Sequence, residues 1–268
     1  MEFPILENSN HDLFFGQYTK PLLLKRLEKY QDQGGCWEDL GFYIEYDHHY
    51  SMTPLDVIPF AGTGGNGIHF GFLTDFGNQK DLANAPIVCV SPTNDPPVKL
   101  IARNLKDFLR IVVVVGLAEL LAHDYESDNE IASELEEWDE GEEPEERKEL
   151  IALLKSDFNI LPLDSIVEYI QTVRDERNAL DILQDHYEIG ILYHCPNDTR
   201  HEYAYESLNL VNLQTYLNQA NKCERLLFYR NATYQYMLSS DDELTRHIIQ
   251  YLIQDNLIRE AKILYKQY

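Results

Sequence analysis

The residues with the clearest chemical potential lie between positions 59 and 75, where the sequence reads PFAGTGGNGIHFGFLTD. Gly62, Gly64 and Gly67 match the GxGxxG spacing with which nucleotide-binding loops hold a pyrophosphate. That chemistry requires a strand before the loop and a helix after it, because the free amides of the helix N-terminus bind the phosphate. The residues after Gly67 alternate as a strand instead, and no P-loop Lys-Ser or Lys-Thr pair follows. We therefore interpret the segment as a tight turn in a sheet, with a nucleotide-binding enzyme as the minor alternative.

Histidine and aspartate residues near this loop are the donors that a metal ion would need. Adjacent histidines on a strand point to opposite faces of a sheet, so His48 and His49 are badly placed to share one ion. The sequence contains neither an HExxH pattern nor a zinc-type Cys/His spacing. We expect neither a metal nor another cofactor at the residues considered for such a site, which are Asp47, His48, His49, His69 and Asp75.

The cysteines are widely spaced and form no CxxC pair. This pattern is more typical of reduced thiols in a cytosol than of a disulfide framework. Cys89 lies within an apolar stretch and is expected to be a core thiol, and no local signature marks it or Cys36 as a nucleophile. We expect reduced thiols at Cys36, Cys89, Cys195 and Cys223.

Carboxylate pairs such as Glu38-Asp39 are abundant in this acidic chain and do not by themselves indicate general acid catalysis. No arrangement of nucleophile, base and orienting group emerges from the sequence either. We therefore expect a binding protein without enzymatic activity.

The charge of the chain is strongly negative and unevenly placed. The net charge is −24, and half of it lies in residues 124–149, which hold 14 acids and 2 bases. Nucleic-acid binding needs basic surface that displaces counterions, so this balance argues against a nucleic-acid partner. It permits a protein partner with a basic surface. Residues 124–149 are interpreted either as a solvated connector or as charge that imitates such a partner's natural ligand.

Two features bear on where the protein resides. The first residues are acidic and lack the basic and apolar regions of a signal peptide. The longest apolar run, Ile111 to Val115, is too short to cross a bilayer. We expect a soluble cytoplasmic protein that does not bind membranes.

The first half of the chain predicts strands flanked by helices. Ile68, Phe70 and Phe72 fall on one face of a strand, whereas His69 falls on the other with Gly71 and Leu73. Asn104 is expected to cap a helix that continues to Leu121. The other expected elements are a helix over 19–31 capped by Thr19, and strands over 42–47, 86–91 and 98–102.

The second half predicts helices. Within the acidic segment, Ile131, Leu135 and Trp138 recur at helical spacing and indicate an amphipathic helix that is interrupted at Gly141 and Pro144. Beyond it we expect helices over 145–156, 164–178, 209–236 (with a possible break) and 241–266, and a short strand over 188–193. The chain is accordingly divided into residues 1–123, an acidic connector over 124–149 and a mostly helical region over 150–268.

Four motifs in order give a family resemblance over about residues 20–123. WEDLG (37–41), an early strand, the 59–75 segment and PIVCVSPTNDPPVKLIARNLKDFL (86–109) resemble the SUKH superfamily, which includes bacterial immunity proteins and fungal regulators of cell-wall glucan synthesis. The resemblance implies an α+β domain with a twisted, mainly antiparallel sheet packed by helices. The positions that match the family's structural motif are Trp37, Gly41, Ala61, Gly64, Gly65, Gly67, Phe70, Ala102, Leu105, Phe108 and Leu109.

The resemblance also implies a function. Bacterial members of the superfamily bind and neutralise a toxin, often a nuclease or deaminase, and the acidic balance suits such a basic target. The alternative is a regulatory or scaffolding module of the same fold that binds its partner through the C-terminal helices. Because loops on a rigid sheet commonly carry recognition, the partner-binding residues are predicted in the Gly-rich loop and the 93–97 loop as Asn66, His69, Thr93, Asn94 and Asp95.

Overall fold

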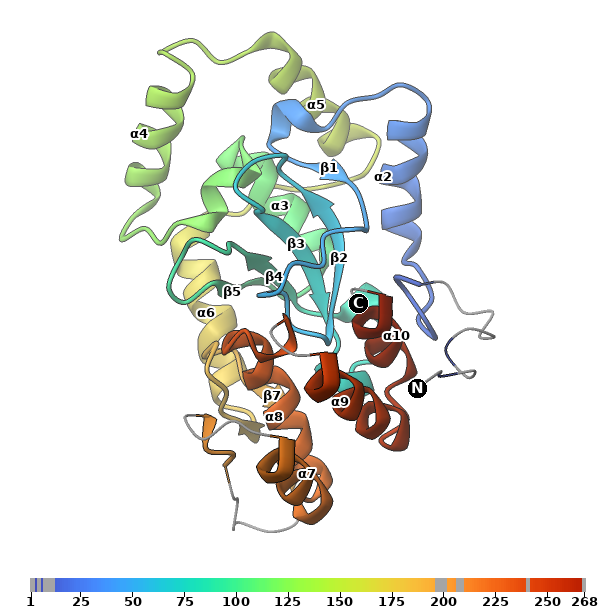
Figure 1. Ribbon diagram of the computed structural model, residues 1–268. Coiled ribbons are helices and arrows are strands. Elements are labelled where there is room, and N and C mark those ends of the chain that lie inside the picture. The colour runs from blue at the N-terminus through green and yellow to red at the C-terminus, as the bar shows by residue number, and fades with distance from the viewer. Residues whose placement is uncertain are drawn as a thin grey trace.

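The computed structural model describes residues 3, 6, 13–195, 202–205, 210–239 and 242–266. It confirms the predicted fold class, an antiparallel five-stranded sheet packed by helices and followed by a helical C-terminal region (Figure 1). The first elements are α2 (Leu22–Asp32), β1 (Tyr43–Ile44), β2 (Val57–Gly62), β3 (His69–Leu73), β4 (Ile87–Val90), β5 (Val98–Ala102) and α3 (Leu105–Val115). They are followed by α4 (Asp128–Trp138), α5 (Glu145–Ser156), α6 (Ile166–Asn178), β6 (Ile182–Leu183), β7 (Ile191–Leu192), α7 (Leu210–Gln219), α8 (Lys222–Tyr234), α9 (Asp242–Gln254) and α10 (Ile258–Lys266).

The strands follow one another in space in the order in which they occur in the chain, β1-β2-β3-β4-β5. Every neighbouring pair is antiparallel. At the β1 edge, the side chain of Gln31 takes the place of a sixth strand, because its amide donates to Ile44 O at 2.9 Å and accepts from Ile44 N at 2.8 Å. The edge that would otherwise be open for pairing is therefore closed from α2 at this position.

The Gly-rich segment joins β2 to β3 as a hairpin, with Gly62 opposite His69. Gly67 adopts φ +70°, a conformation that side chains rarely tolerate, and a Cβ at Gly62 would collide with the His48 ring. A strand follows the loop and no helix begins there, as the alternation after Gly67 predicts. The geometry that a pyrophosphate site needs is therefore missing from this loop.

One face of the sheet packs against α2 and α3 to form an aromatic core. Trp37 is fully buried, donates its indole N–H to Leu27 O at 3.1 Å and stacks on Phe42. Phe108 of α3 lies against Phe60 and Phe70. The same core contains Ala61 and Ala102 of the sheet and Leu105 and Leu109 of α3, all of them buried.

The start of α3 agrees with the prediction and its end does not. Asn104 caps the helix by accepting a hydrogen bond from Asp107 N at 3.0 Å. The helix stops at Gly116, which has φ +77°, and not at Leu121. The residues that follow form a separate 3₁₀ helix, η4 (Ala118–Ala122), because the left-handed glycine turns the chain there.

The opposite face of the sheet is covered by residues from the second half of the chain. Val57, Leu73 and the valines of β4 and β5 pack against Val173 of α6 and against Tyr187 and Ile189. The Tyr187 hydroxyl donates to Met52 O at 2.9 Å and also lies 3.0 Å from Thr233 Oγ1. Residues 150–268 are therefore needed to keep this face of the sheet away from water.

Buried arginines fasten the same region to the sheet. Arg230 of α8 is fully buried and binds both carboxylate oxygens of Asp56, with its Nε at 2.8 Å from Oδ1. Its Nη1 donates to Asp185 Oδ2 at 2.7 Å. Arg177 of α6 forms a two-pronged pair with Asp75 at 2.6 and 3.0 Å. A buried pair of this kind is strongly unfavourable to break, since one charge is left without compensation.

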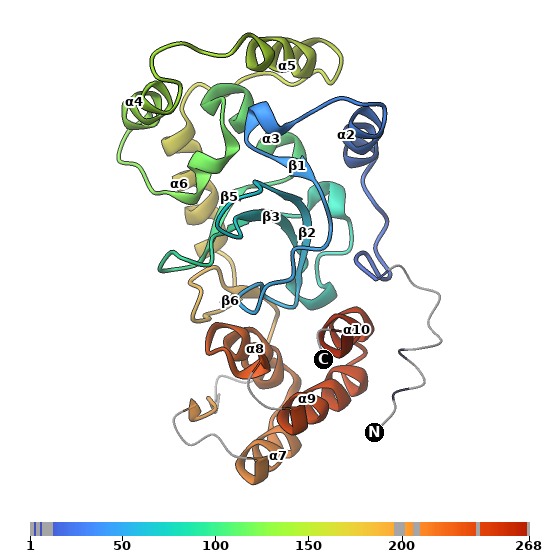
Figure 2. The ribbon, with the colours of Figure 1, turned by 45° about the horizontal axis from the view of Figure 1, so that its top comes forward.

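A third arginine anchors the last helix. Arg259 of α10 donates to the carbonyl oxygens of Phe14, Leu55 and Val57 at 2.6 to 2.9 Å. Helices α7 to α10 contribute most of a second apolar core, which Leu55 and Phe76 from the first half of the chain also enter. These helices lie together at the end of the molecule away from α4 and α5 (Figures 1 and 2). The C-terminal region is thus attached to the first half by apolar packing as well as by charge.

Several boundary expectations need correction. The first helix begins after Pro21, and Thr19 does not cap it. The break that the prediction allowed within 209–236 is present, at Ala220 and Asn221 between α7 and α8. The predicted helix over 241–266 is likewise divided into α9 and α10, because Asn256 adopts φ +62°.

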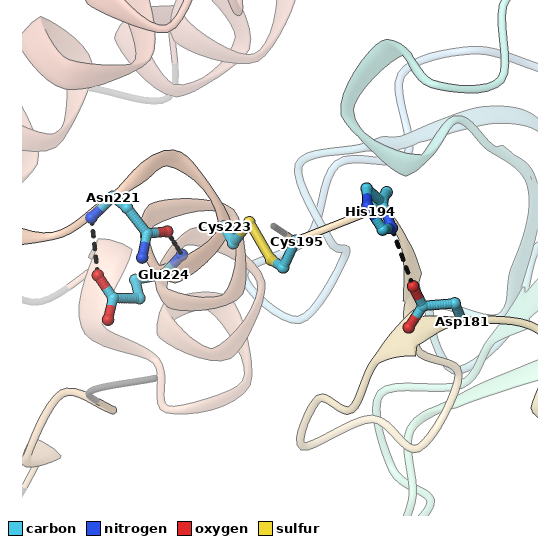
Figure 3. Close-up of a disulfide and its surroundings, with 6 residues drawn as sticks. All are labelled: Asp181, His194, Cys195, Asn221, Cys223 and Glu224. Carbon is cyan, nitrogen blue, oxygen red and sulfur yellow. Dashed lines mark hydrogen bonds and ion pairs between the residues drawn. A yellow bond between two sulfur atoms is a disulfide. The ribbon is translucent and has the colours of Figure 1, made fainter. Parts of the chain in front are cut away.

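The cysteine expectation is wrong for one pair. Cys195 and Cys223 form a disulfide, which no local spacing indicated because 28 residues separate them (Figure 3). Cys36 and Cys89 are free thiols, and Cys89 is buried in the core as expected. Among the described residues, no helix has the length and apolar character needed to cross a membrane.

Candidate partner-binding site

A pocket of about 440 Å³ forms where four segments meet. They are the WEDLG turn, the Gly-rich loop through Thr63, the start of η4 with Leu117 and Glu119, and the acidic segment from the end of α4 to Arg147. We call this cavity the acidic pocket, since carboxylates dominate the charged groups that line it. They are Glu38, Asp39, Glu119, Asp139 and Glu140.

Two left-handed turns bring these segments together. Gly41 ends the 3₁₀ helix η1 (Glu38–Leu40) with φ +73°, and a Cβ there would lie 2.8 Å from Ala118 N. The WEDLG turn can therefore approach the start of η4, which carries Glu119. At the other wall, α4 ends and the chain turns through Glu140 and Gly141, both with positive φ. Local backbone chemistry thus positions acids that are a hundred residues apart in sequence.

Arg147 holds the floor of the acidic pocket. It is 3% exposed, its Nη1 donates to Asp139 Oδ2, and its Nε donates to Asp39 O at 3.0 Å. Its charge is therefore committed to Asp139. Among the described residues, no ion pair joins the other four carboxylates of the pocket to a cation. The pocket consequently keeps a net negative charge that faces solvent.

Trp138 stands at the rim of the acidic pocket. Its side chain is 54% exposed, whereas Ile131 of the same helix is buried and Leu135 is half-buried against the core. The predicted amphipathic helix is thus present as α4, with Ile131 and Leu135 packed towards the core and Trp138 at the exposed end of the helix. An exposed indole beside carboxylates is a suitable neighbour for a guanidinium or an ammonium group.

The predicted loop residues lie beside this pocket. A Cβ at Gly65 would lie 3.7 Å from Glu119 Oε1, and one at Gly67 would lie 3.2 Å from Pro92. The Gly-rich loop therefore has the acidic pocket on one side and the 93–97 loop on the other. Asn66, Thr93 and Asp95 are exposed at this end of the sheet.

Asn94 is only half-exposed and has a structural contact. Its side-chain amide donates to Ala122 O at 2.6 Å and so ties the 93–97 loop to η4. Lys99 donates to the same carbonyl at 3.1 Å and pairs with Asp124 at 2.6 Å. These bonds fix the loop next to the start of the acidic segment.

The expectation that His69 is exposed is wrong. Its side chain is fully buried, Nδ1 donates to Gly67 O at 2.7 Å, and Nε2 lies 3.1 Å from Thr53 Oγ1. Since a carbonyl can only accept, the neutral ring carries its proton on Nδ1 and accepts from the Thr53 hydroxyl at Nε2. Burial lowers the pKa of His69 to about 4, so the ring is neutral at pH 7. His69 thus fixes the hairpin loop from inside.

The remaining residues of the considered metal site do not converge. His48 stacks on His69 with ring centroids 5.8 Å apart and pairs with Glu45, while Asp75 is committed to Arg177. Burial, with the nearby Arg259 guanidinium, holds the pKa of His49 well below its usual range. Asp47, which precedes His48 in the chain, is exposed to solvent. Within the described part of the chain, no group of three or more potential ligands is placed to hold a metal ion.

The acidic pocket was not predicted from the sequence. Glu38-Asp39 was interpreted as an ordinary acidic pair, and Trp138 was assigned only to an amphipathic helix. The available signal was the net charge of residues 124–149, but nothing in the sequence indicated that this segment meets the WEDLG turn. No family model matches the chain, and no curated protein matches it either.

Proposed function

We propose that this chain is a non-enzymatic, immunity-type protein that neutralises a cognate toxin domain by binding its basic surface through the acidic pocket. The observation that carries the proposal is a cavity lined by a half-exposed tryptophan and by four carboxylates that form no ion pair with a cation in the described part of the chain. The order of the WEDLG, Gly-rich and 86–109 motifs agrees with the same class of protein.

The acidic pocket suits an arginine or lysine side chain of the partner. A guanidinium can donate to carboxylates such as Glu119 while its flat face lies on the Trp138 ring. Each charge-assisted hydrogen bond of this kind contributes about 1.5–3 kcal/mol. The net charge of −24 adds a long-range field that speeds encounter with a basic target and weakens with salt.

The test uses the C-terminal domain of a large toxin encoded beside this chain. The domain is expected to co-purify with the full-length protein, and the protein is expected to protect cells that produce the domain. Neutralising three pocket carboxylates in the Glu38→Gln/Glu119→Gln/Glu140→Gln variant should weaken binding by roughly tenfold to a hundredfold.

The matched control removes the same charge elsewhere. Asp32→Asn/Asp164→Asn/Glu168→Gln changes three exposed acids that do not line the pocket, so it should lower only the association rate. Equal loss of affinity in both variants would mean that the weaker binding results from the change in net charge alone, and it would contradict a role for the pocket. Absence of any binding, with cells unprotected, would reject the function itself.

Truncation cannot replace these variants as a test of the alternative in which the C-terminal helices bind the partner. Deleting residues 150–268 removes Val173, Tyr187 and Ile189 from the sheet and leaves Asp56 and Asp75 buried without their arginines. Loss of binding after that deletion would report unfolding. Exposed positions on α7 and α9 are the appropriate sites for testing the alternative.

A further inference from the structure

The Cys195–Cys223 disulfide connects the segment after β7 to α8, and Arg230 of α8 also lies 3.5 Å from Gly190 O, just before β7. Cys195 lies three residues beyond the end of β7, and Cys223 is the second residue of α8 (Figure 3). The Cα atoms are 6.1 Å apart, and 28 residues separate them in sequence. Cys195 is half-buried whereas Cys223 is 5% exposed, so a reagent from solvent reaches the sulfur of Cys195 first.

The surroundings of Cys223 favour its thiolate. It lies in the first turn of a 13-residue helix whose N-terminus is fixed by a capping box between Asn221 and Glu224. The positive end of the helix dipole stabilises a sulfur anion at this position. Lys222 precedes Cys223 in the same helix turn, and its ammonium donates to Asp255 O at 3.4 Å and lies 6.0 Å from the ring of Tyr193, two residues before Cys195. The Glu224 carboxylate in the same turn is engaged by Asn221 N at 2.7 Å.

The residue before Cys195 is a histidine, His194. It adjoins Cys195 in sequence, is largely exposed, and pairs through Nδ1 with Asp181 at 3.2 Å (Figure 3). Thiol–disulfide exchange is fast when the incoming thiolate can reach one sulfur and the other sulfur leaves as a stable thiolate. Cys195 meets the first requirement, and Cys223 at the helix N-terminus meets the second.

We propose that Cys195–Cys223 is a reversible redox tether that exchanges with small-molecule thiols and controls how firmly α7 is held. A thiolate of the glutathione class attacks Cys195 Sγ, the S–S bond breaks, and Cys223 leaves as a thiolate that takes a proton from water. A second thiolate attacks the outer sulfur of the mixed disulfide and releases Cys195. Two small thiols are oxidised to one small disulfide, and the protein takes up the two electrons and two protons.

The element under control is α7, because it lies inside the loop that the bond closes. Leu213 and Leu217 bury it against the C-terminal core, and Gln214 meets His247 of α9 at 2.7 Å. Asn218 accepts from the Tyr251 hydroxyl at 2.7 Å. Reduction of the disulfide leaves these contacts in place but removes the covalent bond that closes the loop between Cys195 and Cys223. The chain-entropy treatment of a loop this long gives a fall of roughly a hundredfold or more in the equilibrium constant for folding of this region, because the reduced chain gains conformational freedom when it unfolds.

The first experiment follows the bond in the full chain carrying Cys36→Ser, which removes the exposed free thiol. The protein is equilibrated in buffers of reduced and oxidised glutathione, alkylated and analysed by mass spectrometry. We expect Cys195 and Cys223 to interconvert reversibly between thiols and disulfide, while Cys89 stays reduced. Failure of the pair to oxidise in excess oxidised glutathione, or resistance of the bond to excess reduced glutathione, overturns the proposal.

Two further measurements test the chemistry and the consequence. Lys222→Gln should slow reduction several-fold, whereas Lys25→Gln, an exposed lysine on α2, should leave the rate unchanged; equal rates contradict the assigned leaving group. Hydrogen exchange of amides 210–219 should be at least tenfold faster in the reduced protein than in the oxidised one. Equal exchange in the two forms contradicts a tether on α7.

Discussion

The two faces of the central sheet are buried by different physical means. The face toward α2 and α3 is an aromatic core in which Trp37, Phe42 and Phe108 interlock. The opposite face is aliphatic at its centre, and the region that covers it is fastened by arginines that bind buried carboxylates. Most rings of the first face come from residues 37–108, although Phe158 also packs on Trp37, whereas the second face is covered by residues more than a hundred positions away in the chain. Local sequence patterns therefore predict more of the first face than of the second.

The largest effect is expected from breaking the charged attachment. Arg230→Met leaves Asp56 and Asp185 buried without their guanidinium, which should cost about 5 kcal/mol of unfolding free energy, the upper end for a broken buried pair. Urea denaturation measures the loss. The matched control is Arg103→Met, which breaks an exposed two-pronged pair with Glu176 and should cost less than about 1 kcal/mol. Similar losses in the two variants would show that burial does not distinguish the pairs.

A slightly smaller effect is expected on the aromatic face. Phe108→Ala removes a fully buried ring that contacts Phe42, Phe60 and Phe70. The lost transfer free energy and the remaining cavity should together cost about 4 kcal/mol, again measured by urea denaturation. Phe108→Leu keeps most of the volume and should recover more than half of that loss. A loss below about 1 kcal/mol for Phe108→Ala would contradict the assignment of this ring to the core.

The buried histidine His69 should make the free energy of unfolding depend on pH. The pKa of His69 is about 4 in the folded protein and about 6.5 when unfolded, so the unfolded chain binds the proton more readily as pH falls. Its contribution is fully present above pH 6.5 and is lost towards pH 4, by up to about 3 kcal/mol. Thermal or urea unfolding from pH 7.5 to 4 should show this loss, and His69→Gln should reduce the slope. An unchanged slope in His69→Gln would mean that other groups dominate acid destabilisation.

The smallest effect concerns the hydroxyl that links the two halves. Tyr187→Phe keeps the ring under the sheet and removes the hydrogen bonds to Met52 O and Thr233. The expected cost is about 1–2 kcal/mol, because buried polar partners lose their bonds. Measured loss near zero would indicate that the carbonyl and hydroxyl find other partners.

The sequence predicted local structure correctly where that structure depends on residues close together in the chain. The alternation of residues 68–73 predicted a strand, and Asn104 predicted the start of α3, because both depend on neighbouring residues. The break at Asn256 was missed because a non-glycine residue in the left-handed region has no reliable signature.

Long-range features were not predictable in this way. Arg230 and Asp56 are 174 residues apart, and a single arginine on a helix is more often a solvated residue than a buried one. The acidic pocket has the same character, because the WEDLG turn and the end of α4 meet only in three dimensions. The disulfide was missed for the same reason, since widely spaced cysteines carry no pairing information.

Fluorescence of Trp138 gives the most direct test of the proposed site. Trp37 is fully buried and Trp138 is half-exposed, so acrylamide quenching of the protein reports mainly on the rim of the acidic pocket. Adding the basic toxin domain should protect Trp138 from quenching, with protection that declines at high salt and in the Glu38→Gln/Glu119→Gln/Glu140→Gln variant. Binding of the domain with Trp138 quenching unchanged would place the interface elsewhere and contradict the account.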